Sequence, residues 1–207
     1  MKHSLYLIAS SGLVGDRPLE KVVKEAIAGG VDVVQLRERD VTSREIYHLA
    51  RRLKEIIKGT PVRLLINDRV DIAMAVGADG VHLGQKGIPV ETVRRMVGHG
   101  MVIGVSTHDL EEALKAEDEG ADYILFSPIF ATRCKPGVEP KGVQALQELQ
   151  EQVDIPIIAL GGINSTTLRE VVRVGVTNAA VMSSILTSED PKAAAAELKA
   201  ILMQREK

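Results

Sequence analysis

Polar side chains that could perform chemistry follow two neighbouring apolar runs in the first half of the chain. Asn67 and Asp68 come directly after the first run, and His82 and Gln85 end the second. Polar groups at the carboxyl ends of successive buried strands are how a parallel barrel builds its active site. The position two residues beyond Gln85 is Gly87, so a second carboxylate is missing where it would complete an acidic pair. The sequence predicts a polar site after these two runs.

Basic residues occupy the same kind of position elsewhere in the chain. Arg37 and Arg39 follow another apolar run, and Arg133 and Lys135 lie in the long segment 127–140. Guanidinium groups and hydroxyls hydrogen-bond phosphate oxygens well. A loop of this length is usually functional or mobile. If these residues share one barrel mouth, they favour an anionic ligand.

Glycine and serine pairs end two apolar runs in the last third of the chain. Gly161-Gly162 follows the seventh run, and Ser183-Ser184 follows the eighth. Barrels often hold a phosphate group against backbone N–H groups of the seventh and eighth loops. Together with the basic residues, these pairs predict a phosphorylated substrate.

The elements that must position these residues alternate regularly. Short apolar runs without strict alternation are typical of parallel strands covered on both faces. Helical patterns lie between them, with a capping box at Thr42 and Glu45 and an N-cap followed by proline at Asp190-Pro191. We therefore expect an α/β fold in which residues 1–207 form a single compact (β/α)₈ barrel, the TIM barrel. The expected strands are 5–9, 31–36, 62–66, 80–83, 101–105, 123–126, 156–160 and 179–182.

Composition narrows the class of protein. The 26 basic and 28 acidic residues nearly cancel, and aromatic residues make up 2% of the chain, which argues against nucleic acid as a partner. No apolar run approaches the roughly 20 residues that span a bilayer, so no membrane partner is expected. A single cysteine fits a reducing compartment. We expect a cytoplasmic enzyme, and the exposed helices of a barrel are compatible with a homodimer.

Each candidate also has a purely structural interpretation. Asn67 or Asp68 could cap the helix that follows them. His82 is more typical of a hydrogen-bonded barrel histidine than of a catalyst, and His108 at a helix start can face solvent. Cys134 has no neighbouring base in the sequence, which argues against a thiol nucleophile.

Five ordered motifs stand at the ends of the expected strands. They are Gln35-Leu36-Arg37-Glu38-Arg39, Asn67-Asp68-Arg69, residues 80–85, Gly104-Val105-Ser106-Thr107-His108 and Gly161-Gly162-Ile163. In order and spacing they resemble the thiamine phosphate synthase family, from Leu5 to about Pro191. The resemblance implies a (β/α)₈ enzyme that joins 4-amino-2-methyl-5-pyrimidinylmethyl diphosphate to a thiazole phosphate. Pyrophosphate leaves first, and the thiazole nitrogen captures the pyrimidine-methyl cation.

The resemblance also implies roles for matching residues. Lys135, Arg37 and Ser106 would be catalytic through the leaving pyrophosphate, and Asp68 would bind Mg²⁺. Charge on a departing pyrophosphate is stabilised by Mg²⁺, arginine and lysine, so neither a general base nor a covalent nucleophile is required. The implied substrate-binding residues are Gln35, Arg37, Arg39, Asn67, Ser106, Thr132, Cys134, Lys135, Gly162, Met182 and Ser183.

Three positions depart from the family pattern. Arg39 stands where the family usually has lysine, and Cys134 where it usually has threonine. Gly87 replaces the second Mg²⁺-binding aspartate. Substrate phosphates can hold Mg²⁺ together with one protein carboxylate, so Asp68 can suffice at lower affinity.

The departures keep two alternatives open. The related thiazole tautomerases share the barrel and bind a thiazole carboxylate phosphate, and Arg39 with the Cys134-Lys135 segment is similar to that branch. Its members carry a histidine acid/base after the sixth strand, where this chain has Ser127-Pro128. The tautomerase would need His82 or His108 as a substitute. A non-catalytic, phosphate-binding regulatory barrel is the third interpretation.

Overall fold

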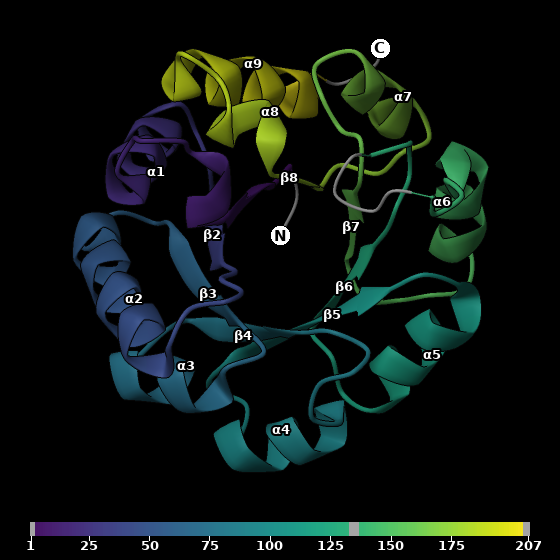
Figure 1. Cartoon of the computed structure of the whole chain (residues 1–207). Coiled ribbons are helices and arrows are strands. Elements are labelled where there is room, and N and C mark those ends of the chain that lie inside the picture. The colour runs from purple at the N-terminus through teal and green to yellow at the C-terminus, as the bar shows by residue number, and fades with distance from the viewer. Residues whose placement is uncertain (1–2, 133–136, 205–207) are drawn as a thin grey trace.

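Eight parallel strands close into a barrel in the order in which they occur in the chain. The structure is a computed structural model that describes residues 3–132 and 137–204. A ring of helices surrounds the strands (Figure 1), which confirms the predicted (β/α)₈ fold. The strands are β1 Leu5–Ala9, β2 Val33–Leu36, β3 Arg63–Asn67, β4 Gly80–Leu83, β5 Val102–Thr107, β6 Tyr123–Phe126, β7 Ile157–Leu160 and β8 Ala179–Val181.

The helices follow the strands with two additions that the sequence pattern did not predict. The 3₁₀ helix η1 Ser11–Leu13 follows β1, and the short helix α8 Ser183–Leu186 lies between β8 and the last barrel helix. None of the described helices combines the length and apolar character that crossing a membrane requires. The α-helices are α1 Leu19–Ala28, α2 Ser43–Ile57, α3 Val70–Val76, α4 Val90–Val97, α5 Leu110–Asp118, α6 Gly142–Gln150, α7 Thr167–Arg173, α8 and α9 Pro191–Met203.

The predicted helix starts are confirmed at two positions. The Thr42 side chain accepts a hydrogen bond from the backbone N–H of Glu45, and the Glu45 carboxylate accepts one from the backbone N–H of Thr42. At α9, Asp190 accepts the N–H of Ala193 and proline occupies the first turn. These contacts form between residues three apart, which is why sequence alone could predict them.

Two strands run further than expected, and both extensions carry site residues. Asn67 belongs to β3 because it still pairs with His82 of β4. Ser106 and Thr107 belong to β5 because they pair with Leu125 and Phe126 of β6. A side chain on a paired strand has less freedom than one on a loop, so the barrel itself fixes Asn67 and Ser106.

The strands place side chains on two sides of the barrel wall. On β6, Ile124 belongs to the core between strands and helices, whereas Tyr123 and Leu125 belong to a separate cluster inside the barrel. The period of two in a strand produces this separation. The inner cluster consists of Tyr6, Ile8, Val33, Leu65, Tyr123, Leu125, Ile158 and Ala180.

Aspartates at the amino ends of the strands make a repeated contact. Asp32, Asp79 and Asp122 stand directly before β2, β4 and β6, and each accepts a backbone N–H from the preceding strand. Each also pairs with a cation from a helix, and these cations are Lys199, Lys54 and Arg94. The accepted N–H groups belong to Leu5 at 2.7 Å, Leu64 at 2.8 Å and Ile103 at 2.7 Å.

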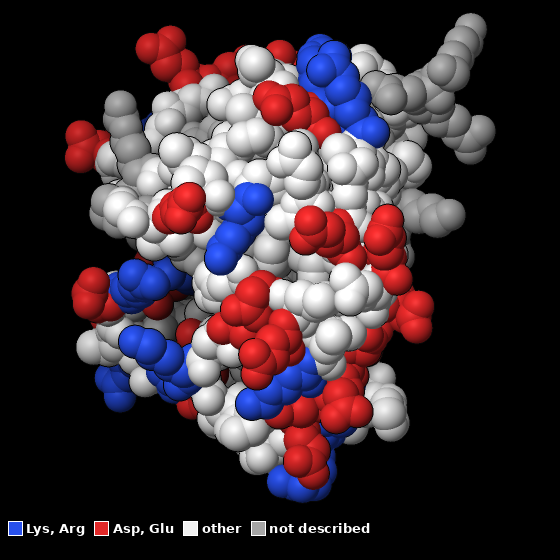
Figure 2. Space-filling model, turned by 90° about the vertical axis from the view of Figure 1, so that its right-hand side faces the viewer, with Lys and Arg blue, Asp and Glu red and all other residues white. Residues whose placement is uncertain are grey.

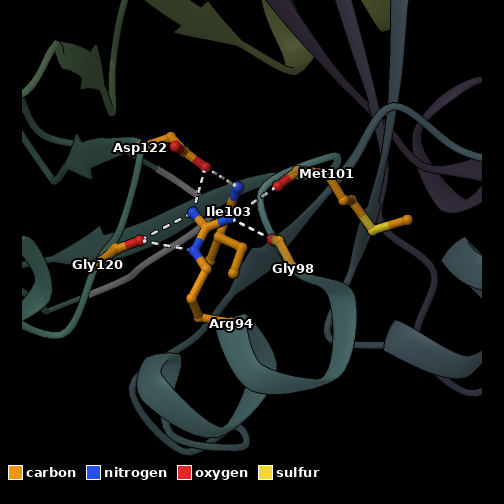
Figure 3. Close-up of polar contacts among 6 residues, drawn as sticks. All are labelled: Arg94, Gly98, Met101, Ile103, Gly120 and Asp122. Carbon is orange, nitrogen blue, oxygen red and sulfur yellow. Dashed lines mark hydrogen bonds and ion pairs between the residues drawn. The ribbon is translucent and has the colours of Figure 1, made fainter.

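Arg94 is the most extensively bonded of these cations (Figure 3). Its guanidinium contacts the Asp122 carboxylate at 2.6 Å and donates to the carbonyl of Gly120 at 2.9 Å. It also donates to the carbonyls of Gly98 at 2.8 Å and Met101 at 3.1 Å. Arg94 therefore joins the end of α4 to the starts of β5 and β6.

We expect Arg94→Met to lower the free energy of unfolding by about 2–4 kcal/mol, because three carbonyls lose this donor and one carboxylate loses its cation. The matched control is Arg95→Met on the same helix, whose 65%-exposed side chain pairs with Glu91. An exposed pair of this kind contributes about 0.5 kcal/mol or less. Denaturant unfolding of both variants is the measurement, and equal losses would contradict the assignment.

Candidate active site

A cavity of about 880 Å³ opens at the carboxyl ends of the strands. Its floor includes inner-facing residues of the barrel, such as Ile8 and Leu125, and its wall includes Arg37 and Arg39. Aspartate and glutamate are absent from its described lining, so the charged side chains of that lining are arginines. Such a cavity favours an anion.

The barrel brings most of the predicted site residues to this cavity. They come from loops or strand ends that are far apart in the chain, and the closed sheet places them on one mouth. Arg133, Cys134 and Lys135 lie outside the described residues. The predicted residues that line the cavity are Gln35, Arg37, Arg39, Asn67, Ser106, Thr132, Gly162, Met182 and Ser183.

Several lining residues were missed by the sequence reasoning. Ser10, Gly12 and Leu13 reach the cavity from the loop after β1, and Asn164 reaches it from the loop after β7. The signal at the first loop was present, because small polar residues directly follow the first apolar run. Asn164 had no comparable signal, because an asparagine before a helix is explained by capping alone. Its side chain does accept the backbone N–H groups of Thr166 and Thr167 before α7.

A line of side-chain hydrogen bonds joins β2, β3 and the loop after β4. Gln35 is 1% exposed, and its Nε2 donates to Asn67 Oδ1 at 2.9 Å. Asn67 Nδ2 then donates to Asp68 Oδ2 at 2.7 Å, and the backbone N–H of Gly84 donates to Asp68 Oδ1 at 2.9 Å. The amides and the carboxylate therefore orient one another.

The helix-cap interpretation of Asn67 and Asp68 is wrong. Arg69 is the N-cap of α3, and that cap has no side-chain hydrogen bond. Asp68 has a left-handed backbone, with φ of 57°, and directs its carboxylate to the loop after β4. It is exposed beside the cavity rather than part of its lining. The capping prediction failed because the long-range partners in β2 and β4 are invisible in the local sequence.

Gln35 also carries an unsatisfied acceptor. Its Oε1 is buried and has no hydrogen-bond partner among the described residues. A buried acceptor left alone costs about 1–3 kcal/mol. Because Gln35 lines the cavity, a ligand that carries an N–H group could satisfy this oxygen.

His82 is a buried, hydrogen-bonded histidine, as its apolar sequence context predicted. It is 2% exposed, with Nδ1 3.0 Å from the Tyr123 hydroxyl and Nε2 2.8 Å from Ser106 Oγ. Burial, with a smaller contribution from Arg37, lowers the pKa of His82 to about 3. The imidazole is therefore neutral near pH 7. The other histidine considered, His108, pairs with Glu112 and does not line the cavity.

Two glycines let the sixth loop pack onto the seventh. Gly161 and Gly162 have φ of 103° and 65°, in the region that favours glycine. A Cβ on Gly161 would lie 2.7 Å from Cα of Pro128, and one on Gly162 would lie 2.6 Å from the carbonyl oxygen of Ala131. The described part of the sixth loop therefore rests directly on these glycines.

We expect Gly162→Ala to destabilise the protein by about 2–4 kcal/mol and to weaken ligand binding, because it adds backbone strain and a clash with the sixth loop. Gly100→Ala is the control, since nothing lies within 4 Å of its added Cβ. Its change in stability should stay within about 0.5 kcal/mol. Thermal unfolding measures both effects, and a Gly162→Ala protein as stable as the control would contradict the packing argument.

Fold and site together define a (β/α)₈-barrel protein with two arginines in the cavity at its mouth. A family model described as thiamine monophosphate synthase matches residues 5–185. The chain belongs to this family. It is 43% identical over 195 residues to a thiamine-phosphate synthase of Clostridium tetani, covering 94% of this chain and 93% of that one.

Two further comparisons agree. A thiamine-phosphate synthase of Chloroflexus aurantiacus is 42% identical over 199 residues, covering 96% of this chain and 92% of that protein. A solved structure, thiamine phosphate pyrophosphorylase from Pyrococcus furiosus, has a TM-score of 0.88 and 36% identity, covering 96% of this chain and 95% of that one. A 3-hexulose-6-phosphate synthase with a TM-score of 0.71 and 19% identity shares the fold.

Proposed function

We propose that this protein is a thiamine-phosphate synthase that couples 4-amino-2-methyl-5-pyrimidinylmethyl diphosphate to thiazole phosphate. The observation that carries the proposal is the cavity at the strand ends, with two arginines and no carboxylate in its described lining. Family membership over nearly the whole chain supports the same reaction. Both substrates are phosphorylated, so the positive mouth suits each of them.

The reaction needs charge stabilisation more than proton transfer. The bond between the pyrimidine methylene carbon and the diphosphate oxygen breaks, and its electron pair leaves with pyrophosphate. The thiazole nitrogen then donates its lone pair to the methylene carbon. Arg37 and Arg39 stabilise the departing pyrophosphate as its charge grows, and the Ser106 hydroxyl adds a hydrogen bond. Preorganised donors of this kind act without a general base.

The remaining lining residues divide between the two substrates. Gln35 and Asn67 bind the pyrimidine, and the buried Oε1 of Gln35 accepts from its amino group. Thr132, Gly162 and the Met182-Ser183 pair receive the thiazole phosphate. Lys135 and Cys134, outside the described residues, keep the leaving-group and substrate-contact roles that the family resemblance implies.

Asp68 would be the one protein ligand of a Mg²⁺ ion that binds together with the diphosphate. Both its carboxylate oxygens already accept one hydrogen bond, and each retains a lone pair for a cation. Among the described residues no group of three or more histidine, cysteine, aspartate or glutamate side chains could hold a metal ion. A substrate-bridged Mg²⁺ needs only one or two carboxylates, and it would neutralise charge on pyrophosphate.

The tautomerase interpretation finds less support at the site. That reaction needs a proton shuttle, and the position after β6 is Ser127, which is 2% exposed. His82 is committed to Tyr123 and Ser106, and its lowered pKa keeps it a weak base. His108 is paired with Glu112 away from the cavity lining. His82 lacks the basicity, and His108 lacks the position, that the substitute role requires.

We also propose that residues 1–207 form one domain that works in the cytoplasm. The closed barrel of the described residues and the single cysteine support this.

Acidic and basic side chains intermingle on the face shown in Figure 2. Such a face offers no single-sign field for nucleic acid. A homodimer is compatible with this arrangement.

Purified protein incubated with both substrates and Mg²⁺ should yield thiamine phosphate, detected by mass. Arg37→Gln should lower kcat/KM by about 100-fold, because it removes charge stabilisation of the leaving group. Arg51→Gln, on an exposed face of α2, is the charge-matched control and should act like the wild type.

Isomerisation of a thiazole carboxylate phosphate without coupling would support the tautomerase. Tight phosphate-ligand binding with neither reaction would support a regulatory barrel.

Gly87→Asp should complete the acidic pair and lower the Mg²⁺ concentration for half-maximal activity by about tenfold. A Cβ at Gly87 would lie 3.3 Å from Asp68 Oδ1 and 3.1 Å from the carbonyl oxygen of Gly84, so the loop must shift by only a few tenths of an ångström. Gly87→Asn has the same shape without the charge and serves as control. Equal Mg²⁺ titration curves for wild type and Gly87→Asp would overturn the single-carboxylate site.

A further inference from the structure

Three inward-facing positions form a row across β4, β5 and β6, and the first of them, His82, lines the cavity. His82 pairs in register with Gly104, and Gly104 pairs with Tyr123. A Cβ on Gly104 would lie 1.9 Å from Cζ of Tyr123, so the tyrosine ring occupies the space above the glycine. The ring thereby crosses β5 and brings its hydroxyl to 3.0 Å from His82 Nδ1. Ser106, two residues further along β5, lies on the other side of the imidazole.

The Tyr123 hydroxyl has one hydrogen-bond partner among the described residues. The side chain is fully buried beside the ring of Tyr6, with the ring centroids 5.6 Å apart. Burial raises the pKa of Tyr123, so the hydroxyl stays protonated. Among the described residues, His82 provides the hydrogen bond that this hydroxyl makes. A buried O–H without an acceptor costs about 1–3 kcal/mol, so Tyr123 donates and Nδ1 accepts.

The direction of this hydrogen bond decides which nitrogen of the imidazole carries the proton. A neutral imidazole carries one proton, and with Nδ1 accepting, that proton is on Nε2. Nε2 then donates to Ser106 Oγ at 2.8 Å. With its oxygen engaged as an acceptor, Ser106 can direct its own hydrogen into the cavity. The backbone carbonyl of Ser106 accepts a hydrogen bond from Gln85 Nε2 at 2.6 Å.

We propose that His82 is a positioning residue which, through the Tyr123 hydroxyl, sets Ser106 as a hydrogen-bond donor to the pyrophosphate group. The opposite tautomer would make Ser106 donate to His82 and present lone pairs to the ligand. A pyrophosphate oxygen only accepts hydrogen bonds, so that arrangement would be repulsive. The proposal rests on the proposed function, since it assigns pyrophosphate to the cavity.

The tautomer can be measured directly by ¹⁵N NMR of the imidazole nitrogens at pH 7.5. The chain has five histidines, and the signals lost in His82→Gln identify His82. We expect Nε2 to carry the proton and Nδ1 to be bare. In Tyr123→Phe the second tautomer should appear, whereas Tyr6→Phe, which removes a neighbouring buried hydroxyl, should leave the tautomer unchanged. A proton on Nδ1 in the wild type would overturn the proposal.

A double-mutant cycle tests whether His82 acts through Ser106. The readout is calorimetric binding of inorganic pyrophosphate, with melting temperatures as the check on folding. Ser106→Ala and His82→Leu should each weaken binding by about tenfold, and the double variant by about tenfold as well. His82→Gln retains an amide donor near the Nε2 position and should recover most of the affinity. Losses that multiply to about 100-fold in the double variant would overturn the proposal.

Neither measurement needs turnover. If no thiamine phosphate forms but the tautomer and the cycle behave as expected, the proposed function fails while the positioning role stands. If product forms but the tautomer is reversed or the losses multiply, the positioning role fails alone.

Discussion

Carboxylates at the amino ends of three strands tie neighbouring strands and helices together where the backbone hydrogen bonds of the sheet end. Asp32, Asp79 and Asp122 each accept a backbone N–H from a neighbouring strand, and each receives a cation from a helix. A backbone N–H left without an acceptor at the start of a strand would be destabilising, and the aspartates supply that acceptor. Because this end satisfies its own polar groups, the carboxyl end can carry polar groups arranged for a ligand. Stability and ligand binding are thereby separated at the two ends of one barrel.

Positive and negative side chains occupy different parts of the mouth. The described lining of the cavity includes Arg37 and Arg39 and no carboxylate, while Asp68 stands exposed beside it. An anion in the cavity and a cation next to Asp68 would stabilise each other. The line of hydrogen bonds from Gln35 through Asn67 holds the Asp68 carboxylate in position. The position of Gly87, where a Cβ would approach that carboxylate, explains why a single substitution can alter the charge of this rim.

The barrel interior gives the mouth its rigidity. Tyr123 fills the inner layer only because Gly104 leaves room for its ring, and the hydroxyl supplies a hydrogen bond to His82 that water cannot reach. A satisfied polar network in a buried site orients its members strongly. Ser106 contacts this network through its hydrogen bond with His82 at the cavity lining. The described part of loop six packs so closely on loop seven that Gly161 and Gly162 leave no room for a side chain.

The order and type of the elements were predictable from the sequence, because apolar period and cap chemistry act between residues a few positions apart. The capping box at Thr42 and the cap at Asp190 are examples. That most of the predicted polar residues would share one mouth also followed, since every βα loop of a parallel barrel opens on the same face. The partners of individual side chains did not follow. That Asp68 binds Gly84 instead of capping α3, and that Tyr123 reaches His82 across Gly104, depends on strand register, which only the closed tertiary structure decides.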